Sequence, residues 1–214
     1  MLLDRKRVKF WQKWVFLAMA ILMAAWLVSI PIGRMAGCGG STSGTVNTLD
    51  DEIAALRRQI AASPGALEAR LNLAEALRRR ANQRVQGSEQ QAADLRASAA
   101  AYEAYVKRLA KTGGTKADRR EAERLQIAAL EDLVAVYRTL NDFDSVRRVY
   151  GQLTELRPNN AQYFYDMGRV ALLAKDTSTA QLAFTRYLEL APDSQEAATV
   201  KQWLKENAGG GSGQ

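Results

Sequence analysis

Apolar residues recur every three or four positions over most of residues 49–207, which is the spacing of one face of a helix. Ile53, Leu56 and Ile60 are an early example. No run of about four to eight β-branched and aromatic residues bounded by turn signals predicts a strand. Only four prolines interrupt the chain, and Ala, Leu, Arg, Glu and Gln all favour helix. We therefore expect an all-α protein.

Two successive segments repeat the same pattern at an offset of 34 residues. Pro158 corresponds to Pro192, and Tyr150 to Phe184. Further pairs at this offset are Val146 and Ala180, Leu133 and Met167, and Leu130 and Phe164. A fixed period of about 20–50 residues indicates a repeat architecture, in which each unit buries its apolar face against the next.

The segment 161–194 shows the most regular unit. Numbered so that its proline is position 32, it has Phe164, Met167, Gly168, Ala171, Ala180, Phe184 and Tyr187 at positions 4, 7, 8, 11, 20, 24 and 27. This resembles the tetratricopeptide (TPR) helix–turn–helix pattern, whose repeat length is 34 residues. Close packing explains the small residues, since bulk at Gly168 or Ala180 would push the two helices apart.

The remaining units are less regular. The unit 127–160 keeps the pattern except at Val134, and its expected turn is 140–144. The unit 67–126 is irregular. Its first helix starts near Leu67, and its second helix contains residues 98–109. Compared with a 34-residue unit, 12 extra residues precede that second helix and 14 extra residues follow it. The resemblance therefore implies a right-handed TPR-like α-solenoid of about three units, and a plain helical bundle is the rival interpretation.

Both ends of the array have their own expected elements. A half-repeat, 49–66, precedes the first unit, and a capping helix, 195–207, follows Pro192 with Asp193 or Ser194 as its N-cap. Terminal repeats need a polar outer face, which the residues of 195–207 supply. A linker, 34–48, and a tail, 208–214, are small and polar and predict flexible segments.

Residues 14–33 contain no charged side chain, and as a helix they would span about 30 Å, the thickness of the bilayer core. The preceding segment, 1–13, is basic, which favours a cytoplasmic N-terminus. We therefore expect a single-pass anchor in the cytoplasmic membrane with the helical domain outside, as in a bacterial-type membrane protein.

A second interpretation of this region treats it as a signal peptide. Residues 35–38, Met-Ala-Gly-Cys, resemble a bacterial lipobox, which would make Cys38 a lipidation site. Met35 in place of leucine, and Arg34 just before it, depart from that pattern. Ordinary cleavage, or a buried helix, is the third alternative.

The net charge of +7 is mostly a property of the N-terminus, because residues 1–40 hold six basic residues and one acid. Arg78, Arg79 and Arg80 are the best candidates for a basic stripe, but three successive residues span about 200° of a helix and form no single face. We expect no nucleic-acid binding. The chain has one cysteine and no histidine, which removes Cys/His zinc sites and Ser–His or Cys–His pairs. We expect no cofactor and no enzymatic activity.

In TPR arrays, positions 2, 5, 9 and 12 of the first helix of each unit face a concave groove. The resemblance assigns ten candidate groove residues of mixed character here: Glu68, Leu71, Glu75, Arg78, Glu131, Arg138, Gln162, Tyr165, Arg169 and Leu172. The Lys/Asn carboxylate clamp of some family members is absent. This mixture favours an extended peptide or a partner helix.

The resulting hypothesis is a membrane-tethered scaffold for protein–protein interaction, with envelope assembly or handling of translocated proteins as the setting by family analogy. The alternative is a structural self-association module, a homo-oligomer within a membrane complex that has no separate ligand.

Overall fold

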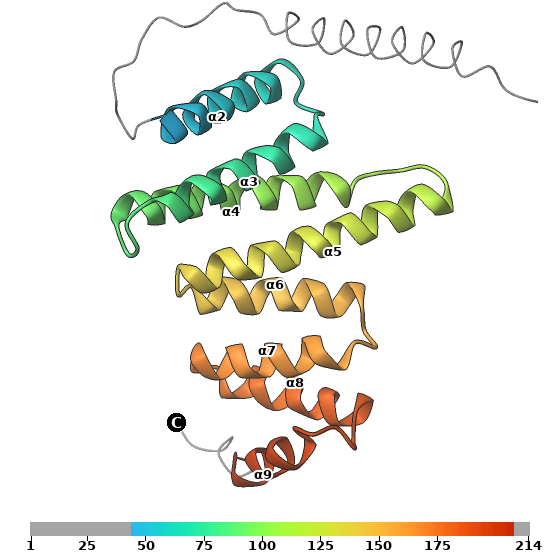
Figure 1. The fold of residues 1–214 in the computed structure, drawn as a ribbon. Helices are drawn as coiled ribbons and strands as arrows, with labels where there is room; N and C mark the ends of the chain where they lie inside the picture. The colour runs from blue at the N-terminus through green and yellow to red at the C-terminus, as the bar shows by residue number, and fades with distance from the viewer. Residues whose placement is uncertain (1–43, 208–214) are drawn as a thin grey trace, which may run out of the picture. The chain divides into compact units, whose positions relative to one another are not determined.

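The computed structural model describes residues 44–207, and this part of the chain is built from helices alone (Figure 1). Its eight helices are α2 (Gly44–Ala62), α3 (Leu67–Gln83), α4 (Glu89–Leu109), α5 (Lys116–Thr139), α6 (Phe143–Leu156), α7 (Ala161–Leu173), α8 (Thr177–Leu190) and α9 (Ala197–Asn207). The all-α prediction is confirmed for these residues.

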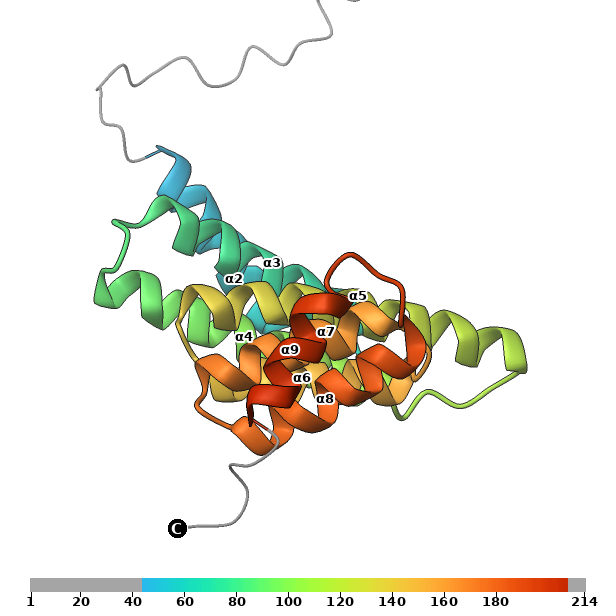
Figure 2. The same cartoon turned by 90° about the horizontal axis from the view of Figure 1, so that it is seen from below.

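Each of these helices packs extensively against the next one in the chain, and no other pair of described helices makes contact of comparable extent. Figures 1 and 2 show the helices following one another from α2 to α9 in the order of the sequence. In a solenoid each repeat contacts only its neighbouring repeats. The arrangement is TPR-like, and it differs from a closed bundle, in which helices distant in sequence pack directly against each other.

The turns inside the last two units repeat with the period of the sequence. Asn141 and Lys175 end their helices with positive φ angles of 55° and 59°. The next residue in each case, Asp142 or Asp176, is the N-cap of the following helix and accepts a hydrogen bond from the backbone N–H three residues on, at 3.0 Å. The same local chemistry therefore reverses the chain twice.

The two excesses of the irregular unit lengthen α4 and the first helix of the next unit, α5. The helix α4 has 21 residues and begins after Ser88, whose side chain accepts from the N–H of Gln91. The helix α5 has 24 residues and begins with a capping box, in which Thr115 and Asp118 each bond the other's backbone N–H. Gly114, just before this cap, has a φ of 125°, a conformation that favours glycine.

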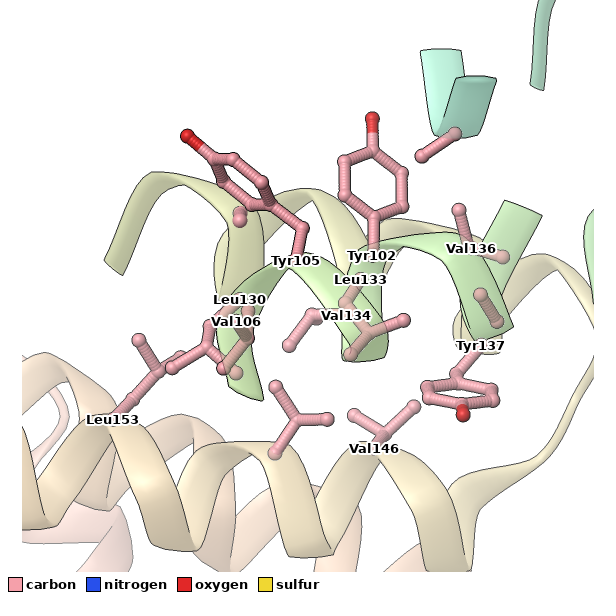
Figure 3. Packing of buried hydrophobic residues seen from close by; sticks show 14 of the residues in the cluster. Tyr102, Tyr105, Val106, Leu130, Leu133, Val134, Val136, Tyr137, Val146 and Leu153 are labelled. Carbon is pink, nitrogen blue, oxygen red and sulfur yellow. The ribbon is translucent and has the colours of Figure 1, made fainter. Parts of the chain in front are cut away.

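Aromatic side chains contribute to the core of the stack. Tyr102, Tyr105, Tyr137, Tyr150 and Phe184 are at most 9% exposed. Figure 3 shows three of them, Tyr102, Tyr105 and Tyr137, with aliphatic residues of α4, α5 and α6 such as Leu130 and Val146. Phe164 is only partly buried, and its ring lies 5.9 Å from the guanidinium of Arg186.

Two predicted boundaries are wrong. The helix α2 begins at Gly44, inside the predicted linker 34–48, because the helix that buries Leu49 and Ile53 extends about one turn further toward the N-terminus. The last helix begins at Ala197 rather than at 195, and one of its two predicted caps, Ser194, has another role. Ser194 donates to the carbonyl of Ala191 and bonds the hydroxyl of Tyr187, so it fixes the preceding turn instead.

None of the helices in the described range 44–207 is long and apolar enough to cross a membrane. The predicted anchor 14–33, the basic segment 1–13, the candidate lipidation site Cys38 and the tail 208–214 all lie outside the described residues.

Gly168 marks the closest approach of α7 and α8. A Cβ atom at this position would lie 2.5 Å from Cε1 of Phe184, well inside contact distance. The prediction that bulk at Gly168 is excluded is confirmed, and the ring of Phe184 is what excludes it. Gly151 on α6 offers a contrast, because a Cβ atom there would have no neighbour within 4 Å.

These two glycines make a matched pair for mutagenesis. We expect Gly168→Ala to lower the free energy of unfolding by about 1–3 kcal/mol, because the added methyl displaces Phe184. Gly151→Ala should raise it by about 0.5–1 kcal/mol, because alanine favours helix and meets no neighbour. Urea unfolding followed by circular dichroism measures both, and equal shifts would contradict the packing described.

Asp176 gives a prediction about pH. The backbone N–H of Thr179, followed by the hydroxyls of Thr179 and Ser178, lowers the pKa of Asp176 from 3.8 to about 2. Because the folded pKa is depressed, its stabilisation is present above pH 4 and is lost as pH falls toward 2. We expect Asp176→Ala to cost about 1–2 kcal/mol at pH 7 and progressively less below pH 4. Asp144→Ala, at an exposed acid in the first turn of α6, is the control and should show a smaller, flatter effect.

Candidate binding surface

The ten predicted groove residues lie on the first helices of the three units, α3, α5 and α7. Six of them are exposed: Glu68, Glu131, Arg138, Gln162, Arg169 and Leu172. The other four, Leu71, Glu75, Arg78 and Tyr165, are half-buried.

Side-chain contacts join these three helices into one row. The guanidinium of Arg78 on α3 lies 3.1 Å from the carboxylate of Asp132 on α5. The hydroxyl of Tyr163 on α7 donates to Glu131 on α5 at 2.6 Å. Burial, together with the hydrogen bond to Glu131, raises the pKa of Tyr163 to about 12. The structure therefore brings the predicted residues of successive units onto adjoining helices.

Tyr165 contacts both the core and a residue of the row. Its ring centroid lies 5.1 Å from that of Tyr187 and 6.1 Å from that of Phe184, both on α8. The guanidinium of Arg169 lies 5.7 Å from the same ring, close enough for a cation–π interaction. Tyr165 is thus held rigidly, and its polar end and Arg169 together offer a preformed contact.

The other predicted residues differ in how far they are already engaged. Leu71 packs against the core, and the amide of Gln162 donates to Asp166 at 3.1 Å. The charged side chains of Glu68, Glu75 and Arg138 form no hydrogen bond or ion pair with any described residue. Leu172 is apolar and exposed. Both signs of charge and one exposed leucine are therefore available along the row.

The arginines considered for nucleic acid are already neutralised. Arg79 pairs with Glu52 at 2.5 Å, and Arg78 pairs with Asp132. Arg80 bonds Asp94 at 2.5 Å and also pairs with Asp50. The hydrogen bond to Asp94, whose side chain is only 9% exposed, is the main cause of the raised pKa of Arg80. These pairs join α3 to α2, α4 and α5, so these arginines stabilise the stack.

Sequence reasoning did not identify two further pairs that join neighbouring helices. The hydroxyl of Tyr137 donates to Glu103 at 2.6 Å, and Arg157 pairs with Glu123. Tyr137 and Glu103 lie on α5 and α4, whereas Arg157 ends α6 and Glu123 lies on α5. The partners therefore occupy different repeat positions, and the period carried no signal that could have found them.

Among residues 44–207 no group of three or more His, Cys, Asp or Glu side chains is placed to hold a metal ion.

No protein-family model matches the chain, and no curated protein matches it. Among solved structures, the chain is similar to YrrB, described as a TPR protein with an unusual peptide-binding site, at 14% identity and a TM-score of 0.30 over 75% of this chain and 87% of that one. It is also similar to two structures of MamA. The first has 16% identity and a TM-score of 0.30, and the match covers 73% of this chain and 96% of that one. The second has 18% identity and a TM-score of 0.28, and the match covers 73% of this chain and 88% of that one. The TPR-like description rests on the helix order, turns and packing given above.

The link between Tyr163 and Glu131 can be tested by titration. We expect Glu131→Gln to lower the pKa of Tyr163 from about 12 toward its ordinary value, because the neighbouring negative charge is removed. The difference in absorbance at about 295 nm between each chain and its Tyr163→Phe counterpart reports this group. Glu68→Gln, at an exposed acid of the same row, should leave the titration unchanged, and an unchanged value in Glu131→Gln would exclude the contact.

Proposed function

We propose that this protein is a non-enzymatic scaffold that binds a protein partner along the row formed by α3, α5 and α7. The observation that carries the proposal is the pair of contacts, Arg78 with Asp132 and Tyr163 with Glu131, that hold the three helices side by side. A row held in this way is preorganised, so binding requires little further ordering of the surface.

The chemistry of the row fits an extended peptide or a partner helix. Glu68 and Glu75 offer negative charge, and Arg138 and Arg169 offer positive charge. Leu172, 37% exposed, adds an apolar contact. A polyanion would meet repulsion from the glutamates, whereas a polypeptide can supply both signs of charge together with apolar side chains.

The proposal includes a location. Residues 14–33 anchor the chain in the cytoplasmic membrane, with the N-terminus cytoplasmic and the helical domain outside, where it serves envelope assembly or the handling of translocated proteins. The uncharged 20-residue run and the basic segment before it support this. Lipidation at Cys38 is the alternative means of attachment, and it places the domain on the same side.

Site-specific photo-crosslinking in the native cell tests the binding row. Ala128 and Ala135 are small, exposed residues at groove positions of α5, and a benzoylphenylalanine at either can reach a bound partner. We expect crosslinks from both positions to the same partner protein. Thr185 and Glu189, on α8 outside the row, are the control positions and should give none.

Two outcomes would contradict the scaffold. Equal crosslinking from all four positions would indicate nonspecific proximity. Crosslinks from 128 and 135 only to a second copy of this chain would replace the scaffold by the self-association module.

A further inference from the structure

A hollow lies between the second helices of two units, α4 and α6, and none of the ten predicted groove residues lines it. The helices α4 and α6 both pack on α5 but make no extensive contact with each other. Between them is a cavity of about 270 Å³. Its floor is apolar and consists of Val106 on α4, Leu130 and Leu133 on α5, and Val149 on α6.

The rim of this cavity is basic. Lys107 on α4 and Arg148 on α6 line it, and the one acid there, Glu103, accepts the hydroxyl of Tyr137. Lys107 also lines an adjoining hollow of about 190 Å³. The rest of that second hollow is lined by Arg70, Ala104, Arg108 and Lys111. We call the two hollows together the α4 surface.

The cations of the α4 surface lack counter-ions within the described chain. The side chains of Lys107, Arg108 and Lys111 form no ion pair or hydrogen bond with any described residue, and that of Arg148 bonds only the hydroxyl of Ser145. Arg70 donates to the carbonyl of Pro64 at 2.8 Å, and its buried Nε has no partner among the described residues.

This contrasts with the arginines that hold the stack together. Arg79, Arg80, Arg147 and Arg157 all pair with carboxylates of other helices. The α4 surface therefore gathers positive charge that the described domain itself does not neutralise, and such a surface attracts a partner of the opposite charge.

We propose that the α4 surface binds an acidic, amphipathic helix of a partner protein. Its apolar stripe fills the hollow over Val106 and Val149, and its flanking carboxylates meet Lys107, Lys111 and Arg148. The stretch 103–109 at the end of α4 rises about 9 Å, which matches roughly one and a half turns of the bound helix.

Residues 1–43 and 208–214 do not match this occupant. The segments outside the described residues cannot supply the acids, since residues 1–43 contain one acid and six bases and residues 208–214 contain no charged side chain. The apolar floor distinguishes a helix from a nucleic acid, whose outer surface is phosphate. This site does not depend on the proposed row of α3, α5 and α7, so each can fail alone.

The test uses the full chain in nanodiscs of zwitterionic lipid and a fluorescein-labelled peptide of about 18 residues, with leucines spaced as one helical face and glutamates on its flanks. Fluorescence anisotropy should show saturable binding of this peptide. Replacing its glutamates by lysine, or its leucines by serine, should abolish the binding.

Matched variants locate the site. We expect Lys107→Gln with Lys111→Gln to weaken binding about five- to tenfold, because two partly exposed ion pairs are lost. Lys201→Gln with Lys205→Gln, the same charge change on exposed positions of α9, should leave the affinity unchanged. Circular dichroism should show both variants folded as the parent is.

Several results would overturn the proposal. These are equal weakening by both variants, equal binding of the lysine peptide, and loss of binding in Arg138→Ala, which would place the peptide on the row of first helices. Binding to vesicles containing phosphatidylserine that needs Lys107 and Lys111, without binding of the acidic peptide, would assign the surface to lipid instead.

Discussion

The structure depends on one constraint: each helix buries its apolar stripe against the helices just before and after it in the chain. The middle of α7 shows how this works. Val170 belongs to the core that runs from α3 to α6, whereas the next residue, Ala171, belongs to the core shared with α8 and α9. The helix α7 thus packs into two cores through two neighbouring faces. Because it belongs to both cores, it joins the separate units into a single stack.

Polar contacts act on top of this packing and reach further along the stack. Arg147 on α6 pairs at 2.7 Å with Asp176, the N-cap of α8, so one carboxylate both starts a helix and ties it to the preceding unit. Arg80 likewise ties α2, α3 and α4 together through Asp50 and Asp94. These links fix the helices in rows, and the rows create two surfaces of different chemistry, one of mixed charge and one basic.

The sequence predicted much of this because the relevant information is periodic or local. The 34-residue offset located the helix pairs, and the expected turn 140–144 located the chain reversal between α5 and α6. The start of α2 at Gly44 was missed because small polar residues at a helix start carry weak propensity. Ser194 was misassigned because its hydroxyl bonds Tyr187, a contact that only the folded turn brings about.

The candidate surfaces were predicted unevenly for a related reason. The row of first helices follows from repeat positions, so its residues could be named from the sequence. The α4 surface combines Arg70 and Lys107 with Arg148, residues separated by the two irregular excesses, and no repeat position connects them. The basic residues can be read from the sequence. Which of them lack a counter-ion can be known only from the structure, because it depends on which base each acid pairs with.

Native-state hydrogen exchange of the full chain in increasing denaturant tests the nearest-neighbour constraint most directly. Within the described domain, α2 and α9 have one neighbouring helix each, and the helices between them have two. The account therefore predicts that amides of α2 and α9 exchange through openings of the lowest free energy. Amides of α4, α5 and α6 should exchange through openings of the highest free energy. Exchange of α9 together with α5 in a single step, at the highest free energy measured, would contradict it.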